Sequence, residues 1–216
     1  MLLQVPFVPN TSDNNHCFQA VFWMVLKHFL PQKKFSSEDM EKFTGYKKDL
    51  WTWPTLAFVN LQKLGFDIDY VSLFETKEFI DRGENYLTEF FGEEIAQAEK
   101  EHSDILKEQN RFRLFLKHTE PIHYLPTLSD IKSYINKDYV VIVNVNSRTL
   151  NNREGYNGHA LLVIGYDNDH IIVHDPGLPP VPERKIPREL FTKAWTYRNN
   201  LCSLVALRLQ GDTLRG

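Results

Sequence analysis

One thiol, one imidazole and one carboxylate in this chain could together perform nucleophilic acyl chemistry. Cys17 stands directly before the apolar run FQAVFWMVL, and His159 and Asp175 lie in the later stretch GHALLVIGYDNDHIIVHDPG. An imidazole that a carboxylate orients can take the proton of a thiol, and the resulting thiolate can attack an amide carbonyl. These residue types therefore indicate acyl chemistry on a thiol, provided that the fold brings them together.

Cys17 is placed at the start of a predicted buried helix. Residues 16–30, HCFQAVFWMVLKHFL, are apolar around most of a helical circumference. Asn14 and Asn15 are candidate caps, and Pro31 helps to end the helix. A helix N-terminus favours a thiolate over a thiol. A lone cysteine on an apolar helix is more often a small buried hydrophobe, so its interpretation as a nucleophile depends on finding a base.

His159 and Asp175 come together if residues 158–177 form a β-hairpin. With Asp167-Asn168-Asp169 as a three-residue loop, His159 lies diagonal to Asp175 on one face, and His174 points to the other face. This register pairs Tyr166 with His170, Val163 with Val173, and Leu161 with Asp175. A two-residue turn would shift the register by one and separate the imidazole from the carboxylate.

The other elements predict helices before strands in one domain. We expect helices over 36–43, 51–65, 127–137 and 187–195, and strands over 66–73, 138–146, 158–167, 170–175 and 201–209. Thr127 or Ser129 suits a helix cap, Pro54 suits a first helical turn, and Gly65 suits a helix C-terminus. The order indicates an α+β fold, with a helical part packed on an antiparallel sheet.

Residues 84–118 differ in character from the rest. Apolar residues recur there at helical spacing, acidic residues gather before Asp104, and basic residues gather after Lys107. That order of charge complements the dipole of one long helix, or of two in series. The segment is either a solvated helical insertion with one packed face or a lid over a binding cleft. A partner protein could also dock on it.

Composition and charge indicate a protein that binds neither nucleic acid nor membranes. The 216 residues are 42% hydrophobic and 25% charged, with a formal net charge of −3. That charge gives no attraction to nucleic acid phosphates or to anionic lipids. The start MLLQVPFVPN lacks the regions of a signal peptide, and no run of about 18 apolar residues could span a bilayer. We therefore expect a soluble protein.

The cysteines and histidines indicate a reducing compartment and no metal. Cys17 and Cys202 form no CxxC pair, so neither a disulfide framework nor a cysteine zinc site is expected. Cys202 lies in the alternating stretch LCSLVALRL and suits a core position. The eight histidines show no metal-ligand spacing. We expect a cytoplasmic protein with neither metal nor other cofactor.

Two parts of the chain resemble papain-like cysteine peptidases of the bacteriocin-leader-processing, or double-glycine, type in their stand-alone branch. VPFVPN…NNHCFQAVFWMVLKHF is similar to the opening of that family. LSDIKSYINKDYVVIVNVN and NGHALLVIGYDNDHIIVHDPG are similar to its second half, where a helix precedes a strand, a Gly-His strand and a strand ending in Asp-Pro. The resemblance covers about 1–74 and 126–209.

This resemblance implies a papain-like fold and cysteine-dependent cleavage of peptide or related amide bonds. It implies one domain over 1–216, with a helical half over 1–74, a helical insertion over 75–125 and a sheet half over 126–216. The matched positions place the nucleophile on Cys17, the base on His159 and the orienting acid on Asp175. His159 follows Cys17 by 142 residues, within the roughly 130–150 typical of papain-type enzymes.

Two positions depart from the family pattern. Phe18 replaces the glycine that follows the nucleophile, and a bulky side chain there could narrow the cleft. Asn10 replaces the glutamine that donates to the oxyanion beside the Cys17 N–H; its amide is one methylene shorter. Losing one such donor typically costs about 2.7–4 kcal/mol of transition-state stabilisation. Asn14 is the alternative donor.

Three functions stay open from the sequence. A hydrolase would pass the acyl group of a peptide or amide substrate to water, and an acyltransferase with the same triad would pass it to an amine. A non-catalytic papain-fold binding protein would use neither step, and Phe18 and Asn10 motivate that alternative. The polar loop 147–157 precedes His159 and could border the substrate site. Trp51 and Trp53 either line the cleft or pack.

Overall fold

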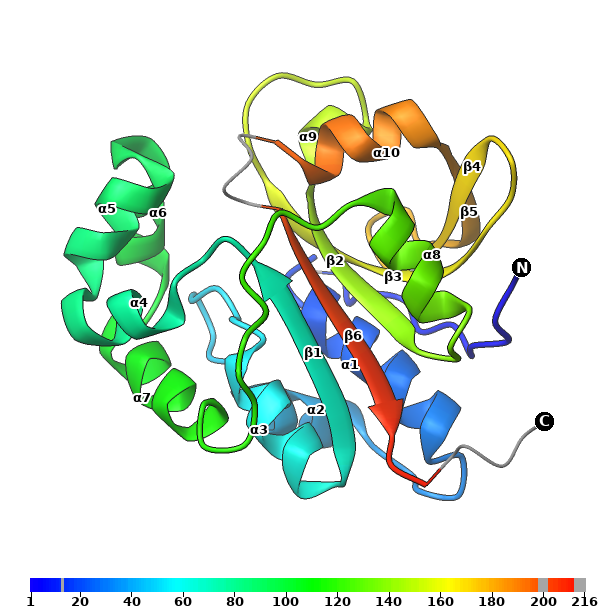
Figure 1. Cartoon of the computed structure of the whole chain (residues 1–216), viewed down its shortest axis with the longest axis horizontal. Helices are drawn as coiled ribbons and strands as arrows, with labels where there is room; N and C mark the ends of the chain where they lie inside the picture. Colours follow the sequence, from blue (N-terminus) through cyan, green and yellow to red (C-terminus); the bar gives the residue numbers. More distant parts are fainter. Residues whose placement is uncertain (13, 198–201, 212–216) are drawn as a thin grey trace.

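Six strands form one sheet through the centre of the molecule, and every neighbouring pair is antiparallel (Figure 1). The computed structural model describes residues 1–12, 14–197 and 202–211. The strands are β1 (Phe66–Ser72), β2 (Val140–Asn146), β3 (Gly158–Tyr166), β4 (His170–Asp175), β5 (Val181–Pro187) and β6 (Ser203–Leu209), in the spatial order β1-β6-β2-β3-β4-β5. The predicted α+β class is confirmed. Leu201, the predicted start of the last strand, lies outside the described residues.

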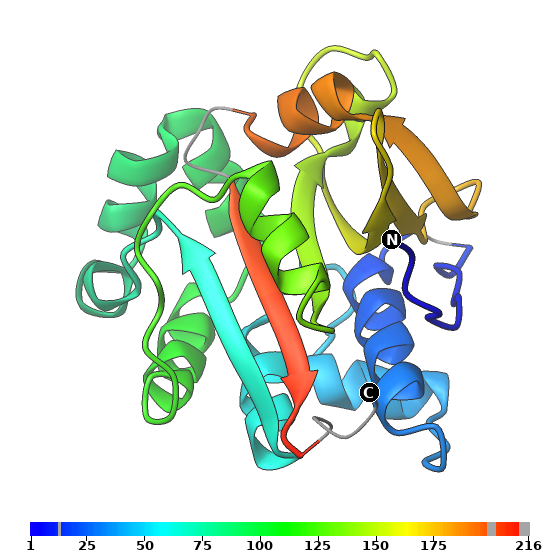
Figure 2. The ribbon, with the colours of Figure 1, turned by 45° about the vertical axis from the view of Figure 1, so that its right-hand side comes forward.

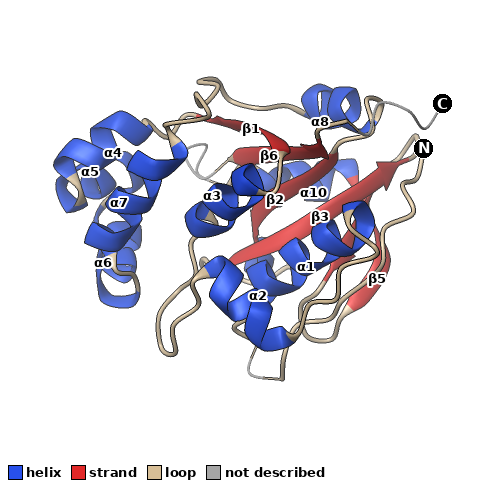
Figure 3. Ribbon diagram, turned by 90° about the horizontal axis from the view of Figure 1, so that it is seen from below, coloured by secondary structure: helices blue, strands red, loops and turns tan. Residues whose placement is uncertain are grey.

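Helices cover both faces of this sheet (Figure 3). On one face lie α1 (Cys17–Phe29), α2 (Ser37–Thr44) and α3 (Thr55–Lys63); on the other lie α8 (Leu128–Ile135), α9 (Ser147–Leu150) and α10 (Arg188–Trp195). Successive strand residues alternate between the two cores, as the pleat requires. In β2, for example, Val140 and Ile142 pack in the α1 core, whereas Val141 and Val143 pack in the α8 core. In the described part of the chain, every helix is too short or too polar to cross a membrane.

Helix starts and ends follow the predicted signals at some positions and not at others. Ser36 and Thr127 each form a capping box at the start of α2 and α8. Gly65 adopts a positive φ of 84° just past α3, which suits glycine at the end of a helix. The predicted start of α3 at residue 51 is wrong: the helix begins at Thr55, directly after Pro54.

The start of α1 is stabilised by a side chain that precedes the helix in the sequence. His16 is its N-cap residue and makes no side-chain cap hydrogen bond, so the prediction that Asn14 or Asn15 caps the helix is wrong. The His16 backbone N–H instead donates to Asn10 Oδ1 at 2.8 Å. Asn14 adopts a positive φ of 60° in the turn between them. The loop before Cys17 is therefore braced by the amide side chain of Asn10.

Residues 76–115 form four short helices, and three of them lie in the segment 84–118 that was predicted to be one helix or two. They are α4 (Thr76–Arg82), α5 (Glu84–Phe91), α6 (Glu93–His102) and α7 (Ile105–Phe115), here called the helical arm, and lie to one side of the sheet (Figure 1). Gly83 and Gly92 interrupt the helices with positive φ values of 52° and 81°, which glycine adopts at little cost. The periodic apolar residues predicted helical structure correctly, but periodicity alone did not indicate the breaks at these glycines.

The β3–β4 hairpin has the predicted register near its open end and a different one near its turn. Val163 pairs with Val173 as predicted, but a bulge follows, so Tyr166 pairs with Ile171 and not with His170. The Asp167 carboxylate accepts hydrogen bonds from the N–H groups of Asp169 and His170, which gives a longer loop than the predicted three residues.

The N-terminal segment lies along α1 and the β3–β5 end of the sheet (Figure 2). Leu2 forms a bridge with Gly165, where a Cβ would lie 2.4 Å from the Met1 carbonyl oxygen. Farther along, His174 Nε2 donates to the Val5 carbonyl at 2.8 Å, and the Asn10 N–H donates to the Pro176 carbonyl at 2.9 Å. The first ten residues therefore connect the loop before Cys17 to the end of β4.

Candidate active site

Cys17, His159 and Asp175 meet where the start of α1 faces the open end of the β3–β4 hairpin. His159 Nε2 lies 2.7 Å from Asp175 Oδ1, and the Cys17 thiol forms a hydrogen bond with the His159 ring. Because Nε2 faces the carboxylate, Nδ1 is the ring nitrogen that faces sulfur. The structure thus brings together the three residues that the sequence pattern selected. His174 points away from them, as predicted, to the Val5 carbonyl.

The surroundings of Cys17 favour its thiolate. Burial of the half-buried side chain raises the thiol pKa, but the hydrogen bond and charge of His159 lower it, as do the backbone N–H groups of Ala160 and Phe18. The lowering effects prevail, so the pKa of Cys17 falls below its ordinary value. The helix start thus contributes through a specific donor, the Phe18 N–H, as well as through its dipole.

The pKa of His159 is shifted in the opposite direction to that of Cys17. Burial lowers its pKa, but the hydrogen bonds to Asp175 and Cys17 raise it, and the net result is a pKa of about 9. A lowered thiol pKa beside a raised imidazole pKa favours a thiolate–imidazolium pair at neutral pH. Such a pair holds a nucleophile and a proton donor ready at adjacent atoms.

The Asp175 carboxylate is held on both oxygens. Oδ1 accepts from His159 Nε2 and from the Gly177 N–H at 2.9 Å, while Oδ2 accepts from Arg184 Nη1 at 2.7 Å. Burial alone would raise the carboxyl pKa, but these partners, His159 foremost, lower it to about 2. The side chain is 6% exposed, so it stays ionised and fixed in one orientation throughout the neutral range.

Arg184 is a site residue that the sequence analysis missed. It lies on β5, whose sequence VPERKIP carries two prolines and many polar residues and so reads as a loop. A second bulge, between Val173 and Asp175, also shifts the β4–β5 register. The other terminal nitrogen of Arg184, Nη2, donates to Asn151 Oδ1 at 3.2 Å. No sequence motif signals this arginine; only the pairing of an edge strand brings it to Asp175.

Asn10, the predicted oxyanion donor, lies buried in the loop before α1. Its Oδ1 accepts from the N–H groups of Thr11 and His16, each at 2.8 Å. Its Nδ2 donates to Asn14 Oδ1 at 3.1 Å. An amide nitrogen carries two N–H donors, so one remains for another acceptor. Asn14 serves here as the acceptor for Asn10, and its use as an alternative donor stays a prediction.

The aromatic residues around the site separate into packed and exposed ones. The Phe18 ring stacks on Phe22 at 6.1 Å, against the α1 core. Trp195 is buried in the second core and donates to the Ser203 carbonyl, so it is a packing residue, as is buried Cys202. Trp51 is 45% exposed, while Trp53 packs against Phe79 and directs its indole N–H at Glu99.

Comparison with known proteins gives a family and a fold. Residues 2–203 match the model of the Peptidase_C39 like family. The peptidase domain of Streptococcus ComA, described as a bifunctional ABC transporter in quorum sensing, aligns over 96% of this chain and 100% of its own, with a TM-score of 0.52 and 17% identity. The search of curated proteins gave no match.

Two further solved structures are more distant. A double glycine motif protease from an AMS/PCAT transporter, in complex with the leader peptide, aligns over 95% of this chain and 92% of its own, with a TM-score of 0.49 and 13% identity. A C39-like peptidase structure from Bacillus anthracis aligns over 46% of this chain and 58% of its own, with a TM-score of 0.34 and 20% identity. The ComA peptidase domain supports the papain-like arrangement of helices and sheet described above.

Proposed function

This chain belongs to the Peptidase_C39 like family, and from that premise we propose that it is a papain-like cysteine hydrolase that cleaves a peptide or another amide through Cys17. The hydrogen-bonded chain from the Cys17 thiol through His159 to Asp175 carries the proposal. A buried cysteine that only packs has no need of a basic partner. The arrangement is that of a nucleophile, a base and a group that orients the base.

The proposed cycle uses each group at a stated atom. The Cys17 thiolate attacks the carbonyl carbon, and the oxyanion is held by the Cys17 N–H and the remaining Asn10 amide N–H. The imidazolium of His159 gives its proton to the leaving amine, and a thioester remains on sulfur. Neutral His159 then takes a proton from water, whose oxygen attacks the thioester, and the acid product leaves as the thiolate re-forms.

The choice of water over an amine as acyl acceptor follows from the family, whose description is that of peptidases. An acyltransferase would use the same residues and differ only in the second step. A reducing compartment such as the cytoplasm would keep Cys17 as a reactive thiol, since both Cys17 and Cys202 are free.

Alkylation with iodoacetamide between pH 5 and 9, with mapping of the modified cysteine, tests the proposal directly. Cys17 should react faster at pH 6 than an ordinary thiol does, because its pKa is lowered. His159→Ala should slow the reaction at pH 6, because it removes the hydrogen bond and charge that lower the thiol pKa, and an ordinary thiol of pKa about 8.5 is only about 0.3% ionised there.

Cys202 is the internal control for this labelling. Its side chain is fully buried, and burial raises its thiol pKa to about 12, so native protein should carry no label there. Labelling of Cys17 that rises only near pH 8.5, with no effect of His159→Ala, would favour the non-catalytic binding protein.

Arg184→Met should lower kcat/KM for peptide hydrolysis about 10- to 100-fold, because a hydrogen bond to a charged group is worth about 1.5–3 kcal/mol. Without the guanidinium, the pKa of Asp175 rises from about 2. On acidification, the variant should therefore lose activity at a higher pH than the wild type does. A degenerate library of internally quenched peptides, assayed from pH 3 to 9, measures both effects.

The matched control is the next residue on β5. Lys185 is exposed and lies 3.7 Å from Asp167, away from the site. Lys185→Met should leave the rate within about twofold, and Arg184→Lys should recover part of the loss. An unchanged acid limb in Arg184→Met would show that this arginine only stabilises the fold.

A further inference from the structure

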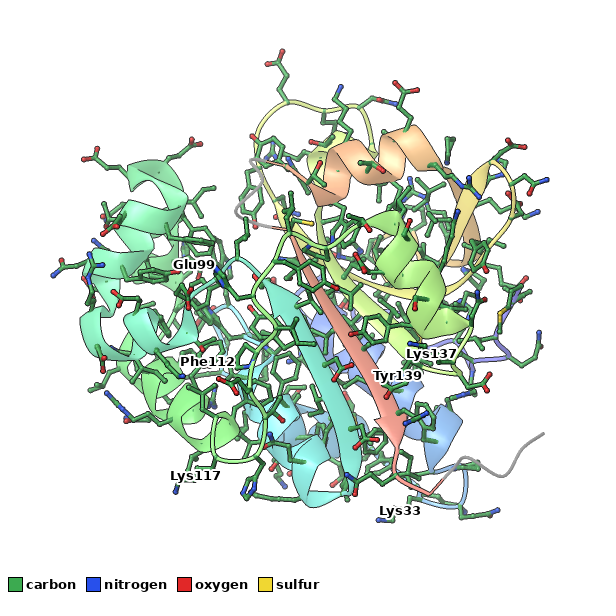
Figure 4. The ribbon with its side chains drawn as sticks, viewed as in Figure 1. Lys33, Glu99, Phe112, Lys117, Lys137 and Tyr139 are labelled. Carbon is green, nitrogen blue, oxygen red and sulfur yellow. The ribbon has the colours of Figure 1, made fainter. Side chains whose placement is uncertain are left out.

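His174 is a buried histidine that the proposed triad does not use. It lies on β4 directly before Asp175, and successive side chains of a strand point to opposite faces of the sheet. The residue is 3% exposed, and its ring meets the Phe7 ring edge-on, with centroids 5.2 Å apart. β4 and β5 lie at the end of the sheet away from the helical arm, in which Glu99 and Phe112 are labelled in Figure 4. The charged groups of the arm therefore do not face this histidine.

Both ring nitrogens of His174 bind main-chain groups of other segments. Nε2 donates to the Val5 carbonyl at 2.8 Å, and Nδ1 accepts from the Glu183 N–H at 3.2 Å. A donor at Nε2 and an acceptor at Nδ1 together define the neutral tautomer with its proton on Nε2. Burial lowers the pKa of His174, so the ring is neutral at neutral pH. This one ring thus joins the N-terminal segment, β4 and β5.

The Glu183 N–H belongs to a bulge in β5. The β4–β5 register shifts between Val173 and Asp175, so two residues of β5 stand opposite His174. Glu183 adopts a positive φ of 51°, which is strained for a residue that carries a Cβ. A bulge removes a backbone group from the ladder and re-aims the neighbouring side chain. The re-aimed side chain is that of Arg184, which donates to Asp175 Oδ2 at 2.7 Å.

We propose that His174 is a positioning residue for Asp175: its neutral, Nε2-protonated ring holds the β5 bulge that aims Arg184 at the Asp175 carboxylate. The consequence for catalysis rests on the proposed function, whereas the aim of Arg184 is measurable without substrate. The same ring also binds the Val5 carbonyl. The segment that leads to Asn10 and the strand that supports Asp175 therefore share one anchor.

Two variants separate the two hydrogen bonds of His174. In His174→Asn, the side-chain oxygen stands where Nδ1 was and can still accept from the Glu183 N–H. In His174→Gln, the amide nitrogen stands where Nε2 was and can still donate to the Val5 carbonyl, but no acceptor remains for Glu183. Both variants remove the ring, so the loss of its contact with Phe7 is common to both. The first variant should keep the bulge, and the second should lose it.

The guanidinium N–H signals of Arg184 report on the bulge without any substrate. They are recorded in ¹H–¹⁵N spectra of the full-length chain and assigned through Arg184→Met. In the wild type and in His174→Asn they should be resolved, because the charge-assisted bond to Asp175 hinders rotation of the guanidinium. In His174→Gln they should merge with the signals of solvated arginines.

Peptide hydrolysis gives the second readout, with the internally quenched peptide library used for Arg184→Met. His174→Gln should lower kcat/KM about 10- to 100-fold and move the acid limb to higher pH, as the loss of Arg184 does. His174→Asn should stay within about threefold of the wild type and keep the acid limb in place. Adding Arg184→Met to His174→Gln should cost nothing beyond Arg184→Met alone, because the two changes remove the same interaction.

His170→Gln is the matched control, because His170 lies on the same strand but its ring contacts Asp167 near the turn. It should leave both readouts as in the wild type. Equal loss of the Arg184 signals in His174→Asn and His174→Gln, or their retention in both, would overturn the proposal.

The wild-type chain supplies a test that needs no variant to fold. Long-range ¹H–¹⁵N spectra at pH 7 should show the His174 proton on Nε2, and a proton on Nδ1 would overturn the proposal. A wild type that cleaves no peptide, together with Arg184 signals that His174→Gln alone abolishes, would instead refute the proposed function and leave the role of His174 at the bulge standing.

Discussion

Cys17→Ala should lower peptide hydrolysis at least about 10⁴-fold, because removing the nucleophile of a catalytic triad costs on the order of 10⁶ in kcat. In the proposed cycle the thioester forms on the Cys17 sulfur, which alanine lacks. The residue is half-buried at the first position of a helix, and alanine is the best helix former. The free energy of unfolding should therefore change by less than about 1 kcal/mol.

The second cysteine provides the control for this variant. Cys202 lies in the other core, with its sulfur 3.9 Å from the Pro126 carbonyl oxygen. Cys202→Ala should lower stability by about 1 kcal/mol through the small void it leaves and keep full activity. Chemical denaturation and the internally quenched peptide library measure the two quantities. Hydrolysis that survives in Cys17→Ala would disprove the thiol mechanism.

Asp175→Asn should lower kcat/KM about 10²- to 10⁴-fold, the range that general acid–base catalysis typically contributes. The amide keeps the shape of the carboxylate but carries no charge to stabilise the imidazolium. The direction of the pH effect follows from the His159 pKa. Asp175 helps to raise the pKa of His159 to about 9, and activity falls as pH rises through that value. In the variant this basic limb should move to lower pH.

A second His–Asp pair on the same hairpin gives a matched control. Asp167 lies 3.0 Å from His170 at the turn, with its side chain 38% exposed, far along the strands from Cys17. Asp167→Asn should leave kcat/KM within about twofold and the basic limb in place. A loss as large as in Asp175→Asn would mean that the hairpin as a whole, and not the carboxylate beside His159, controls the rate.

The sequence was sufficient to predict the pieces that depend on local pattern. Alternation and branched residues predicted β2, β3 and β4, and the capping signals predicted the starts of α2 and α8. The Val163–Val173 register was enough to bring His159 near Asp175. The turn end of the hairpin differs because a bulge between Val163 and Gly165 shifts the register, at the place where Leu2 from the distant N-terminal segment bridges Gly165.

The parts that depend on distant contacts were not predictable. Arg184 reaches Asp175 only because an edge strand with two prolines joins the sheet. Glu99 on α6 accepts from the Trp53 indole N–H, which belongs to a distant part of the chain. Periodicity reports which face of a helix is buried but not what it is buried against. Sequence reasoning therefore selected three residues that the fold brings together and missed the residues that contact them.

The N-terminal segment has a consequence for engineering. The Asn10 N–H donates to the Pro176 carbonyl, so a main-chain hydrogen bond sets the spacing between the nucleophile loop and the acid loop. Exposed residues of the segment, such as Gln4 and Pro6, should accept substitution readily, whereas Val5, Val8 and Asn10 are buried. An insertion or deletion of a single residue between Val5 and Asn10 would displace two loops at once.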